Sequence, residues 1–179
     1  MGAGTGATVG KAAGIDGAMK GGVGCWIEHA GDAAVAAIAV VNAFGDVLDG
    51  GGAIVAGARG PDGRFLDSAR LLAHGSPRRL PDDLPVNTTV AVVATNVALS
   101  RTGIGQLARA ASAALYRRLS PAGTLFDGDI VFALCPHEGP SAHQLRVEAL
   151  AVRALETAIE RAVRLARGRD GVPGLADQA

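Results

Sequence analysis

The sequence predicts an α/β protein in which layers of β-sheet are covered by helices. Apolar residues make up 49% of the chain, but aromatic residues make up only 3%. Ala, Val and Gly side chains must therefore fill most of the core, which lets backbone elements pack closely, as in layered proteins. Runs with strand character dominate the first half, and two helical patterns occur in the second. At 179 residues, the chain is long enough for a single domain, residues 1–179, with a substantial core.

The first half is predicted to contain a glycine-rich loop followed by strands. Residues 2–24 include nine glycines, a density that disfavours both helix and strand and indicates a long loop. Strands are expected over residues 25–30 and 33–47, joined by a tight turn, because both segments are rich in apolar residues and are bounded by turn residues. A shorter strand is expected over residues 53–58, and residues 67–75 have a helical pattern.

The second half is predicted to alternate strand and helix. A proline-containing linker over residues 76–87 separates the halves. A strand is expected over residues 88–98, followed by a helix that Ser100 caps. Another strand is expected over residues 129–135, and Pro140-Ser141 is expected to open a long amphipathic helix.

Charge and cysteine content argue against several functional classes. The 17 basic and 17 acidic residues cancel, so nothing indicates binding to nucleic acid or to an anionic membrane surface. Two cysteines are too few for a disulfide scaffold or a cysteine-rich metal site, and the four histidines lack metal-ligand spacing. Residues 1–6 have neither the basic nor the apolar segment of a secretory leader. We therefore expect a cytoplasmic protein without a metal ion.

A polar step marks the start of the strand expected over residues 88–98. Asn87 and Thr88 precede a run of β-branched and small residues typical of a buried strand. A threonine at this point is usually an ordinary strand start. In the alternative interpretation, the chain cuts itself between Asn87 and Thr88 and uses Thr88 as a nucleophile. The freed α-amine of Thr88, whose unperturbed pKa is about 8, would then be the base.

Four further residues can take part in such chemistry, and each also has a plain structural interpretation. Asp127 and Asp129 flank Gly128, so on an extended segment both carboxylates can face one side and share a proton or hold an ammonium group. By itself this triplet would be a turn. The neutral amide of Asn42 suits a developing oxyanion but can equally satisfy buried backbone groups. Lys11, one of two lysines in the chain, is either catalytic or a solvated loop cation.

Four segments together carry a resemblance to a known family. They are GAGTGATVGK (2–11), VVNAFGDV (40–47), NTTVAVVATN (87–96) and FDGDIVFAL (126–134). In this order and spacing they resemble the DmpA-type L-aminopeptidase/D-amidase-esterase family, which includes β-peptidyl aminopeptidases and the nylon-oligomer hydrolase NylC. The resemblance implies a four-layer αββα sandwich of the N-terminal-nucleophile hydrolase kind. It also implies a precursor that cleaves itself into residues 1–87 and 88–179.

The resemblance implies a role for each matched residue. Thr88 would be the nucleophile, Asn42 would donate to the oxyanion, and Asp127 and Asp129 would be the acidic pair behind Thr88. Lys11 occupies the position of a lysine implicated in the nylon-oligomer branch. The family hydrolyses amide or ester bonds without a metal or organic cofactor, and it assembles as tetramers, so a homo-oligomer is expected.

Three functional hypotheses remain open at this point. Members of the family are roughly twice as long, and the part before the glycine-rich loop has no counterpart here, so we expect a sandwich that is incomplete at its N-terminus. The first hypothesis is a self-processing threonine hydrolase of short peptides or amino amides, acting as an aminopeptidase. The second is an endo-hydrolase of ω-amino acid oligomers. The third is a truncated, inactive fragment that serves only as an assembly remnant.

Overall fold

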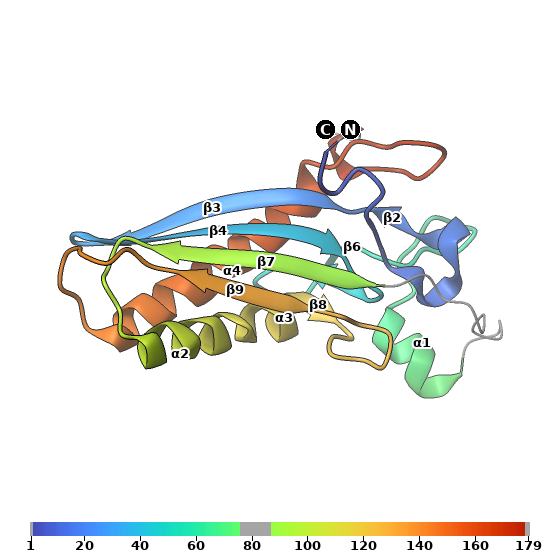
Figure 1. Cartoon of the computed structure of the whole chain (residues 1–179). Helices are drawn as coiled ribbons and strands as arrows, with labels where there is room; N and C mark the ends of the chain where they lie inside the picture. The colour runs from blue at the N-terminus through green and yellow to red at the C-terminus, as the bar shows by residue number, and fades with distance from the viewer. Residues whose placement is uncertain (1, 76–86, 178–179) are drawn as a thin grey trace.

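The computed structural model describes residues 2–75 and 87–177 (Figure 1). Apart from Asn87, the linker predicted over residues 76–87 lies outside the described residues. The strands are β1 (Thr8–Val9), β2 (Met19–Lys20), β3 (Gly22–Ala30), β4 (Ala33–Asn42), β5 (Asp46–Leu48), β6 (Ile54–Ala56), β7 (Thr88–Thr95), β8 (Leu119–Ser120) and β9 (Ile130–Leu134). The α-helices are α1 (Ser68–His74), α2 (Arg101–Ala111), α3 (Ala113–Arg118) and α4 (Gln144–Arg164). Three short 3-10 helices are η1 (Lys11–Ala13), η2 (Ile15–Gly17) and η3 (Leu175–Asp177).

The main sheet has four strands in the order β3-β4-β7-β9. Strands β3 and β4 form the predicted hairpin, with pairing from Gly22 opposite Val41 to Ala30 opposite Ala33. Strand β7 is antiparallel to β4, and β9 is parallel to β7. The connection from β7 to β9 contains α2 and α3, as a crossover between parallel strands requires. The strand predictions for residues 25–30, 88–98 and 129–135 are therefore confirmed.

Helices α2, α3 and α4 cover one face of the main sheet (Figure 1). Strand residues on this face are buried and mostly small, as in Val35, Ala37, Ala39 and Val41 of β4. Gly24 of β3 lies so close to α4 that a Cβ atom there would collide with the carbonyl oxygen of Ala158. The small-residue composition thus serves close packing of helix on sheet, as the sequence predicted.

The opposite face of the main sheet is apolar and exposed. In the described part of the chain, neither a helix nor a second sheet covers it (Figure 1). Its exposed side chains are Val23, Ile27, Ile38, Val90, Ile130, Phe132 and Leu134. The α/β class is confirmed, and the described residues supply one main sheet and one helix layer of the four layers that the resemblance implied. None of the described helices has the length and apolar character needed to span a bilayer.

Two expectations for the first half are corrected. The strand predicted over residues 33–47 is two strands in different sheets, because the chain turns at residues 43–45 before β5 pairs with β6 and β8. The turn is held from outside, since the backbone N–H of Gly10 donates to the carbonyl oxygen of Gly45 at 2.9 Å. The glycine-rich region 2–24 is also more ordered than expected, with β1 paired to β2 and with η1 and η2 between them.

The helix ends in the second half agree only in part with the prediction. Ser100 caps α2 as expected, because its hydroxyl accepts from the backbone N–H of Gly103 at 3.1 Å. The last helix does not begin at Pro140-Ser141. Its cap is His143, whose Nδ1 accepts from the backbone N–H of Leu145 at 3.3 Å.

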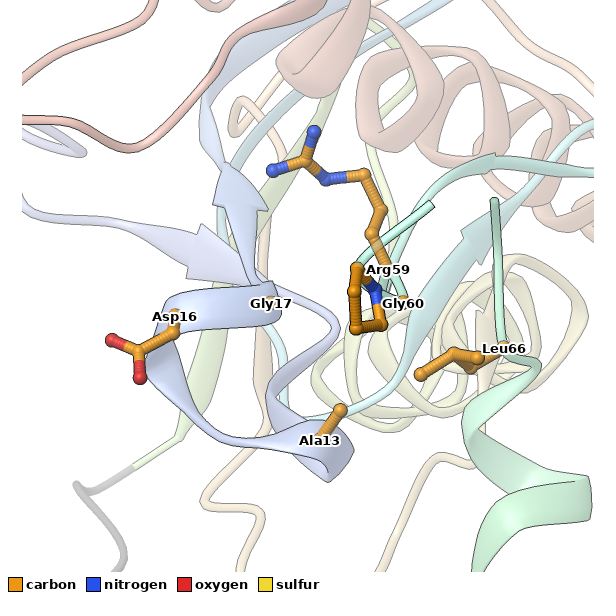
Figure 2. A pocket seen from close by; sticks show the side chains of 7 residues that line it. Ala13, Asp16, Gly17, Arg59, Gly60 and Leu66 are labelled. Carbon is orange, nitrogen blue, oxygen red and sulfur yellow. The ribbon is translucent and has the colours of Figure 1, made fainter. Parts of the chain in front are cut away.

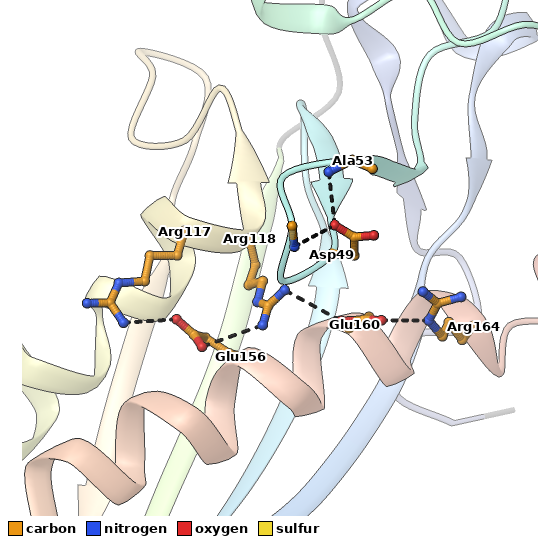
Figure 3. A network of polar contacts seen from close by, with 8 residues as sticks. Asp49, Ala53, Arg117, Arg118, Glu156, Glu160 and Arg164 are labelled. Atoms are coloured by element: carbon orange, nitrogen blue, oxygen red, sulfur yellow. Dashed lines mark hydrogen bonds and ion pairs between the residues drawn. The ribbon is translucent and has the colours of Figure 1, made fainter.

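A network of ion pairs joins α3 to the C-terminal half of α4 (Figure 3). Arg118 lies between Glu156 and Glu160, 3.5 Å from an oxygen of each, and is largely buried. Arg117 adds a 3.1 Å contact to Glu156, and Arg164 adds a 2.7 Å contact to Glu160. Because several partly buried charges share partners, this network fixes α3 on α4 more firmly than isolated surface pairs would.

Candidate active site

The sheet topology brings the ends of three segments together. Strand β4 ends at Asn42 and β7 begins at Thr88, and these two residues face each other in the antiparallel ladder. Strand β9 is parallel to β7, so the loop 127–129 that precedes it lies at the same end of the sheet. Asn87 forms a parallel bridge with Asp127. Residues far apart in the sequence therefore meet at one end of the main sheet.

The peptide bond between Asn87 and Thr88 lies in a closely packed environment. Oγ1 of Thr88 donates to the carbonyl oxygen of Asn87 at 2.6 Å, and the backbone N–H of Gly128 donates to the same oxygen at 2.9 Å. A Cβ atom on Gly128 would lie 3.0 Å from Oγ1 of Thr88. Asn87 is fully buried. This carbonyl oxygen already has a donor of the kind that stabilises a developing oxyanion.

The ammonium group of Lys11 lies between the two asparagines. Its Nζ donates to Oδ1 of Asn42 at 2.9 Å and to Oδ1 of Asn87 at 2.8 Å. Backbone carbonyl oxygens of Asn42 and Ala43 accept from it at 3.2 and 3.1 Å. Lys11 is 3% exposed, which excludes the solvated loop cation. Burial lowers the pKa of Lys11 to about 8, although the negative charge of Asp127 opposes this change.

The side chain of Asn42 has a fixed orientation. Its Oδ1 accepts from Nζ of Lys11 and also from the backbone N–H of Thr8 at 3.1 Å. The carbonyl side of the amide is thus held by β1 and η1. A role of Asn42 as a donor to an oxyanion stays a prediction.

The two aspartates are held by different segments. Oδ2 of Asp127 accepts from the backbone N–H and the hydroxyl of Thr124 at 2.9 and 2.8 Å, which closes a turn over residues 124–127. The triplet 127–129 itself is not the turn expected from its residue types, because Asp127 bridges to Asn87 and the segment leads directly into β9. Oδ1 of Asp129 accepts from the backbone N–H of Thr89 at 2.6 Å. Burial raises the pKa of Asp129, and the charge of Asp127 adds to this effect, while the Thr89 hydrogen bond opposes it. The carboxyl group of Asp129 therefore holds a proton more readily than an exposed aspartate does.

The sequence predictions give no functional role to Thr124 or Gly128. Both act on predicted residues: Thr124 orients Asp127, and Gly128 donates to the Asn87 carbonyl oxygen. Thr and Asp side chains both form local bonds in turns, so the sequence indicates a turn near Thr124, although it does not specify the contact between the two side chains. The Gly128 contact depends on the parallel pairing of β7 and β9, which the sequence does not state.

In the described residues, the predicted site is associated with neither a metal-binding cluster nor the cavity beside η1. Among residues 2–75 and 87–177, no group of three or more His, Cys, Asp or Glu side chains is placed to hold a metal ion. A cavity of about 360 Å³ lies beside η1, between η2 at Asp16 and the segment 59–61. In Figure 2 the Asp16 carboxylate and the Arg59 guanidinium point in different directions. None of the six predicted site residues lines this cavity.

The arrangement of the sheet and its covering helices matches solved structures. The PH0078 protein from Pyrococcus horikoshii has a TM-score of 0.65 at 21% identity, over 97% of this chain and 46% of that chain. The L-aminopeptidase D-Ala-esterase/amidase from Ochrobactrum anthropi, described as a variant of the Ntn hydrolase fold, has a TM-score of 0.54 at 22% identity, over 86% and 44%. The chain thus has the fold of this class of hydrolase.

The chain belongs to peptidase family S58, whose family profile matches residues 1–174. It is 36% identical over 137 residues to an uncharacterized aminopeptidase of Mycobacterium leprae, covering 72% of this chain and 35% of that protein. It is 30% identical over 153 residues to the 6-aminohexanoate-oligomer endohydrolase of a Kocuria species, covering 77% and 41%. The chain therefore spans less than half the length of these relatives.

Proposed function

We propose that the chain cleaves itself between Asn87 and Thr88 and that the freed Thr88 then hydrolyses amide and ester bonds of short peptides or amino amides. The observation that carries this proposal is the geometry of the Asn87 carbonyl group. Its oxygen accepts from both Oγ1 of Thr88 and the backbone N–H of Gly128. A nucleophile and an oxyanion donor thus meet at one carbonyl group.

Self-cleavage would proceed through an ester. Oγ1 of Thr88 attacks the carbonyl carbon of Asn87 and loses its proton, the C–N bond breaks, and the nitrogen of Thr88 gains a proton and becomes an amine. Water then cleaves the ester, which leaves a carboxylate on Asn87 and restores the hydroxyl of Thr88. The Gly128 N–H stabilises the negative charge on oxygen during the attack, and one such donor contributes roughly 3 kcal/mol.

The buried Lys11 and the half-buried Asp129 can take the proton of the hydroxyl in the uncut chain. The pKa of Lys11 is about 8, so about a tenth of its amine is neutral at pH 7. Asp129 contacts the backbone next to Thr88 and has a raised pKa, which makes its carboxylate a better base than an exposed one. After cleavage, the α-amine of Thr88 adds a third base adjacent to the hydroxyl.

Substrate hydrolysis would repeat this chemistry on an external carbonyl group. Thr88 forms an acyl-enzyme, its α-amine carries the proton to the leaving amine, and water releases the acid. Asn42 faces Thr88 across β4 and β7, and we propose its amide as a donor to the substrate oxyanion. Aminopeptidase-like action on short peptides is favoured by the 36% identity to the mycobacterial aminopeptidase.

A second candidate is endo-hydrolysis of ω-amino acid oligomers. The likeness to the 6-aminohexanoate-oligomer endohydrolase extends over 77% of this chain. Such oligomers present repeated amides without α-substituents, whereas aminopeptidase substrates present one free α-amine. Hydrolysis of an N-acetylated 6-aminohexanoate oligomer would favour the second candidate, because an enzyme that requires a free amino terminus leaves it intact.

The open apolar face of the main sheet is the observation behind the third hypothesis, an inactive remnant that serves only in an assembly. A contiguous apolar surface of this kind marks a surface covered by another protein element. We propose that the working protein is an assembly in which this face is covered, in line with the oligomer that the family resemblance implies. Sedimentation of the purified protein tests this proposal, and a stable monomer with full activity would contradict it.

The proposal is tested by purifying the chain and its Thr88→Ala variant and assaying both on an amino acid p-nitroanilide and on an amino amide. We expect product from the wild type only. Activity that persists in folded Thr88→Ala would exclude Thr88 as the nucleophile. A folded wild type without activity on any amide tested, including the oligomer, would favour the remnant.

A further inference from the structure

A buried carboxylate outside the predicted site connects three segments that surround Lys11. Asp46 is the first residue of β5 and is fully buried. Its Oδ1 accepts from the backbone N–H of Ala58 at 2.8 Å and from the hydroxyl of Ser68 at 2.6 Å. Its Oδ2 accepts from the backbone N–H of Ser68 at 2.6 Å. A buried carboxylate is costly unless it is hydrogen-bonded, and here three donors from two segments supply the bonds.

The segment before Asp46 holds Lys11 directly. The backbone N–H of Lys11 donates to the carbonyl oxygen of Phe44 at 2.8 Å, and its Nζ donates to that of Ala43 at 3.1 Å. The N–H of Gly10 donates to Gly45 at 2.9 Å. The position of the Lys11 ammonium group therefore depends on where the turn 43–45 lies, and Asp46 is the next residue after this turn.

The hydrogen bond of Asp46 to Ala58 reaches a segment that packs against the backbone just before Lys11. Gly10 has a φ of 71° and packs so closely on Gly57 and Ala58 that a Cβ atom would not fit. Gly57 in turn packs against the carboxylate of Asp46 without room for a side chain. Asp46 thus fixes Ala58, and Ala58 fixes the backbone immediately before Lys11. The ammonium group is held from both sides by segments that meet at one carboxylate.

We propose that Asp46 is a positioning residue for Lys11: it ties the turn 43–45, the segment at Ala58 and the start of α1 into one unit that holds the Lys11 ammonium group between Asn42 and Asn87. Asp46 touches no reacting atom and acts through Lys11. This proposal rests on the proposed function for its catalytic consequence. The effect of the Asp46 hydrogen bonds on Lys11 is a property of the folded chain and can be measured without activity.

Substitutions at Asp46 and Ser68 distinguish the hydrogen bonds that Asp46 accepts from the backbone from the one that it accepts from the Ser68 hydroxyl. Asp46→Asn keeps one carbonyl acceptor but places an NH₂ group against an N–H donor, so at least one tie is lost. Ser68→Ala removes only the hydroxyl donor and keeps both backbone donors. Asp49→Asn is the matched control, because Asp49 accepts from the N–H groups of Gly51 and Ala53 in an exposed turn (Figure 3).

The first measurement uses the Thr88→Ala chain, which cannot cleave itself by the proposed route. Its two lysines are Lys11 and Lys20. Each is acetylated with acetic anhydride at a series of pH values, and peptide mass spectrometry of the products gives the pH midpoint of its ionisation. We expect a Lys11 midpoint near 8. In Asp46→Asn it should rise by about one pH unit, because a loosened turn admits water to the ammonium group and reduces its desolvation. Asp127 is the charged group that acts on Lys11, and it is unchanged in every variant.

Lys20 is the internal control, since its Nζ donates to the carbonyl oxygen of Thr5 and not to the turn. We expect its midpoint to be the same in all variants, a smaller rise for Lys11 in Ser68→Ala, and none in Asp49→Asn. If Asp46→Asn does not fold, Ser68→Ala carries the test. An unchanged Lys11 midpoint in the folded Asp46→Asn chain, or in Ser68→Ala where that chain alone folds, would overturn the proposal.

The second measurement follows self-cleavage in chains that retain Thr88, made by cell-free synthesis and sampled over time. Asp46→Asn should cleave about tenfold more slowly at pH 7, since small displacements of reacting groups are costly, and the midpoint of its pH–rate profile should move upward. If the wild type stays uncut but the ionisation midpoint of Lys11 still rises in Asp46→Asn, the result would contradict the proposed function alone. If the wild type cleaves itself and Asp46→Asn has the same cleavage rate and the same pH–rate profile, the result would contradict the positioning role alone.

Discussion

The backbone N–H of Gly128 donates to the carbonyl oxygen of Asn87 at 2.9 Å. This bond belongs to the bridge between Asn87 and Asp127, which continues the parallel register of β7 and β9 three residues beyond the pair Val90 and Ile130. It also places a hydrogen-bond donor on the carbonyl group that Thr88 is proposed to attack. In the proposed mechanism, the bond of this bridge also serves as the contact to the oxyanion.

Gly128→Ala should slow self-cleavage by about tenfold with little loss of stability. The added Cβ would lie 3.0 Å from Oγ1 of Thr88, so the hydroxyl must move by a few tenths of an ångström, and such displacements reduce rates steeply. Time courses of cleavage by gel electrophoresis give the rate. Gly105→Ala on α2 is the control, because open space surrounds Gly105. A variant with the wild-type rate would show that Oγ1 does not attack from the observed position.

Thr124→Val should also slow self-cleavage, by a smaller factor. The hydroxyl of Thr124 donates to Oδ2 of Asp127 at 2.8 Å, while the backbone donor at 2.9 Å is retained. A hydrogen bond to a charged group contributes about 1.5–3 kcal/mol, and only part of its loss affects the orientation of Asp127. We expect about a threefold lower rate in the same gel assay. Thr102→Val, which removes a hydroxyl that contacts only the Ser100 cap, should have no effect.

Replacing Lys11 by Met should change how stability depends on pH. The pKa of Lys11 is about 8 in the folded chain, against an ordinary value of 10.5. Between these values the unfolded chain binds more protons, so the contribution of Lys11 to stability rises with pH. Relative to Lys11→Met, the Lys11 chain should gain about 2 kcal/mol in unfolding free energy from pH 8 to pH 10.

Urea unfolding of the Thr88→Ala chain, with and without Lys11→Met, measures this difference at each pH. Cleavage does not interfere in this background. A difference that stays constant over pH 8 to 10 would mean that Lys11 ionises as an exposed lysine does, and its burial in the site would then be wrong.

Gly24→Ala should destabilise the chain by several kcal/mol. The new Cβ would collide with the carbonyl oxygen of Ala158 in α4, and overpacking that displaces backbone costs about 1–3 kcal/mol or more. The exposed helical Gly105→Ala should instead stabilise by about 0.5–1 kcal/mol. Thermal unfolding followed by circular dichroism separates the two outcomes. A Gly24→Ala chain as stable as the wild type would refute the close packing of α4 on β3.

The residue types of the site and most strands were predictable from the sequence because the signals are local. Asn42, Thr88 and Asp129 each lie at the end of an apolar run, and the structure places these strand ends at one end of the main sheet. The charged state and surroundings of Lys11 were not predictable. They depend on the turn 43–45, which lies in a segment whose apolar pattern predicts a continuous strand.

The missed features share one physical cause, which is contact between segments distant in sequence. Asp46 reads as part of a Gly-Asp turn signal, but its partners Ala58 and Ser68 lie 12 and 22 residues away. Gly128 reads as a turn glycine, and its donor role exists only because β9 pairs with β7. Local patterns predict elements and strand ends, whereas the bonds that orient the site arise from tertiary packing.

The central claim is that the peptide bond before Thr88 breaks in the folded chain. N-terminal sequencing of the purified wild-type protein tests it most directly, with intact mass measured on the same sample. The account predicts two pieces, residues 1–87 and 88–179, with threonine as the new amino terminus of the second, and a single uncut chain for Thr88→Ala. A well-folded wild type that shows only its original amino terminus and the mass of the full chain would contradict the account.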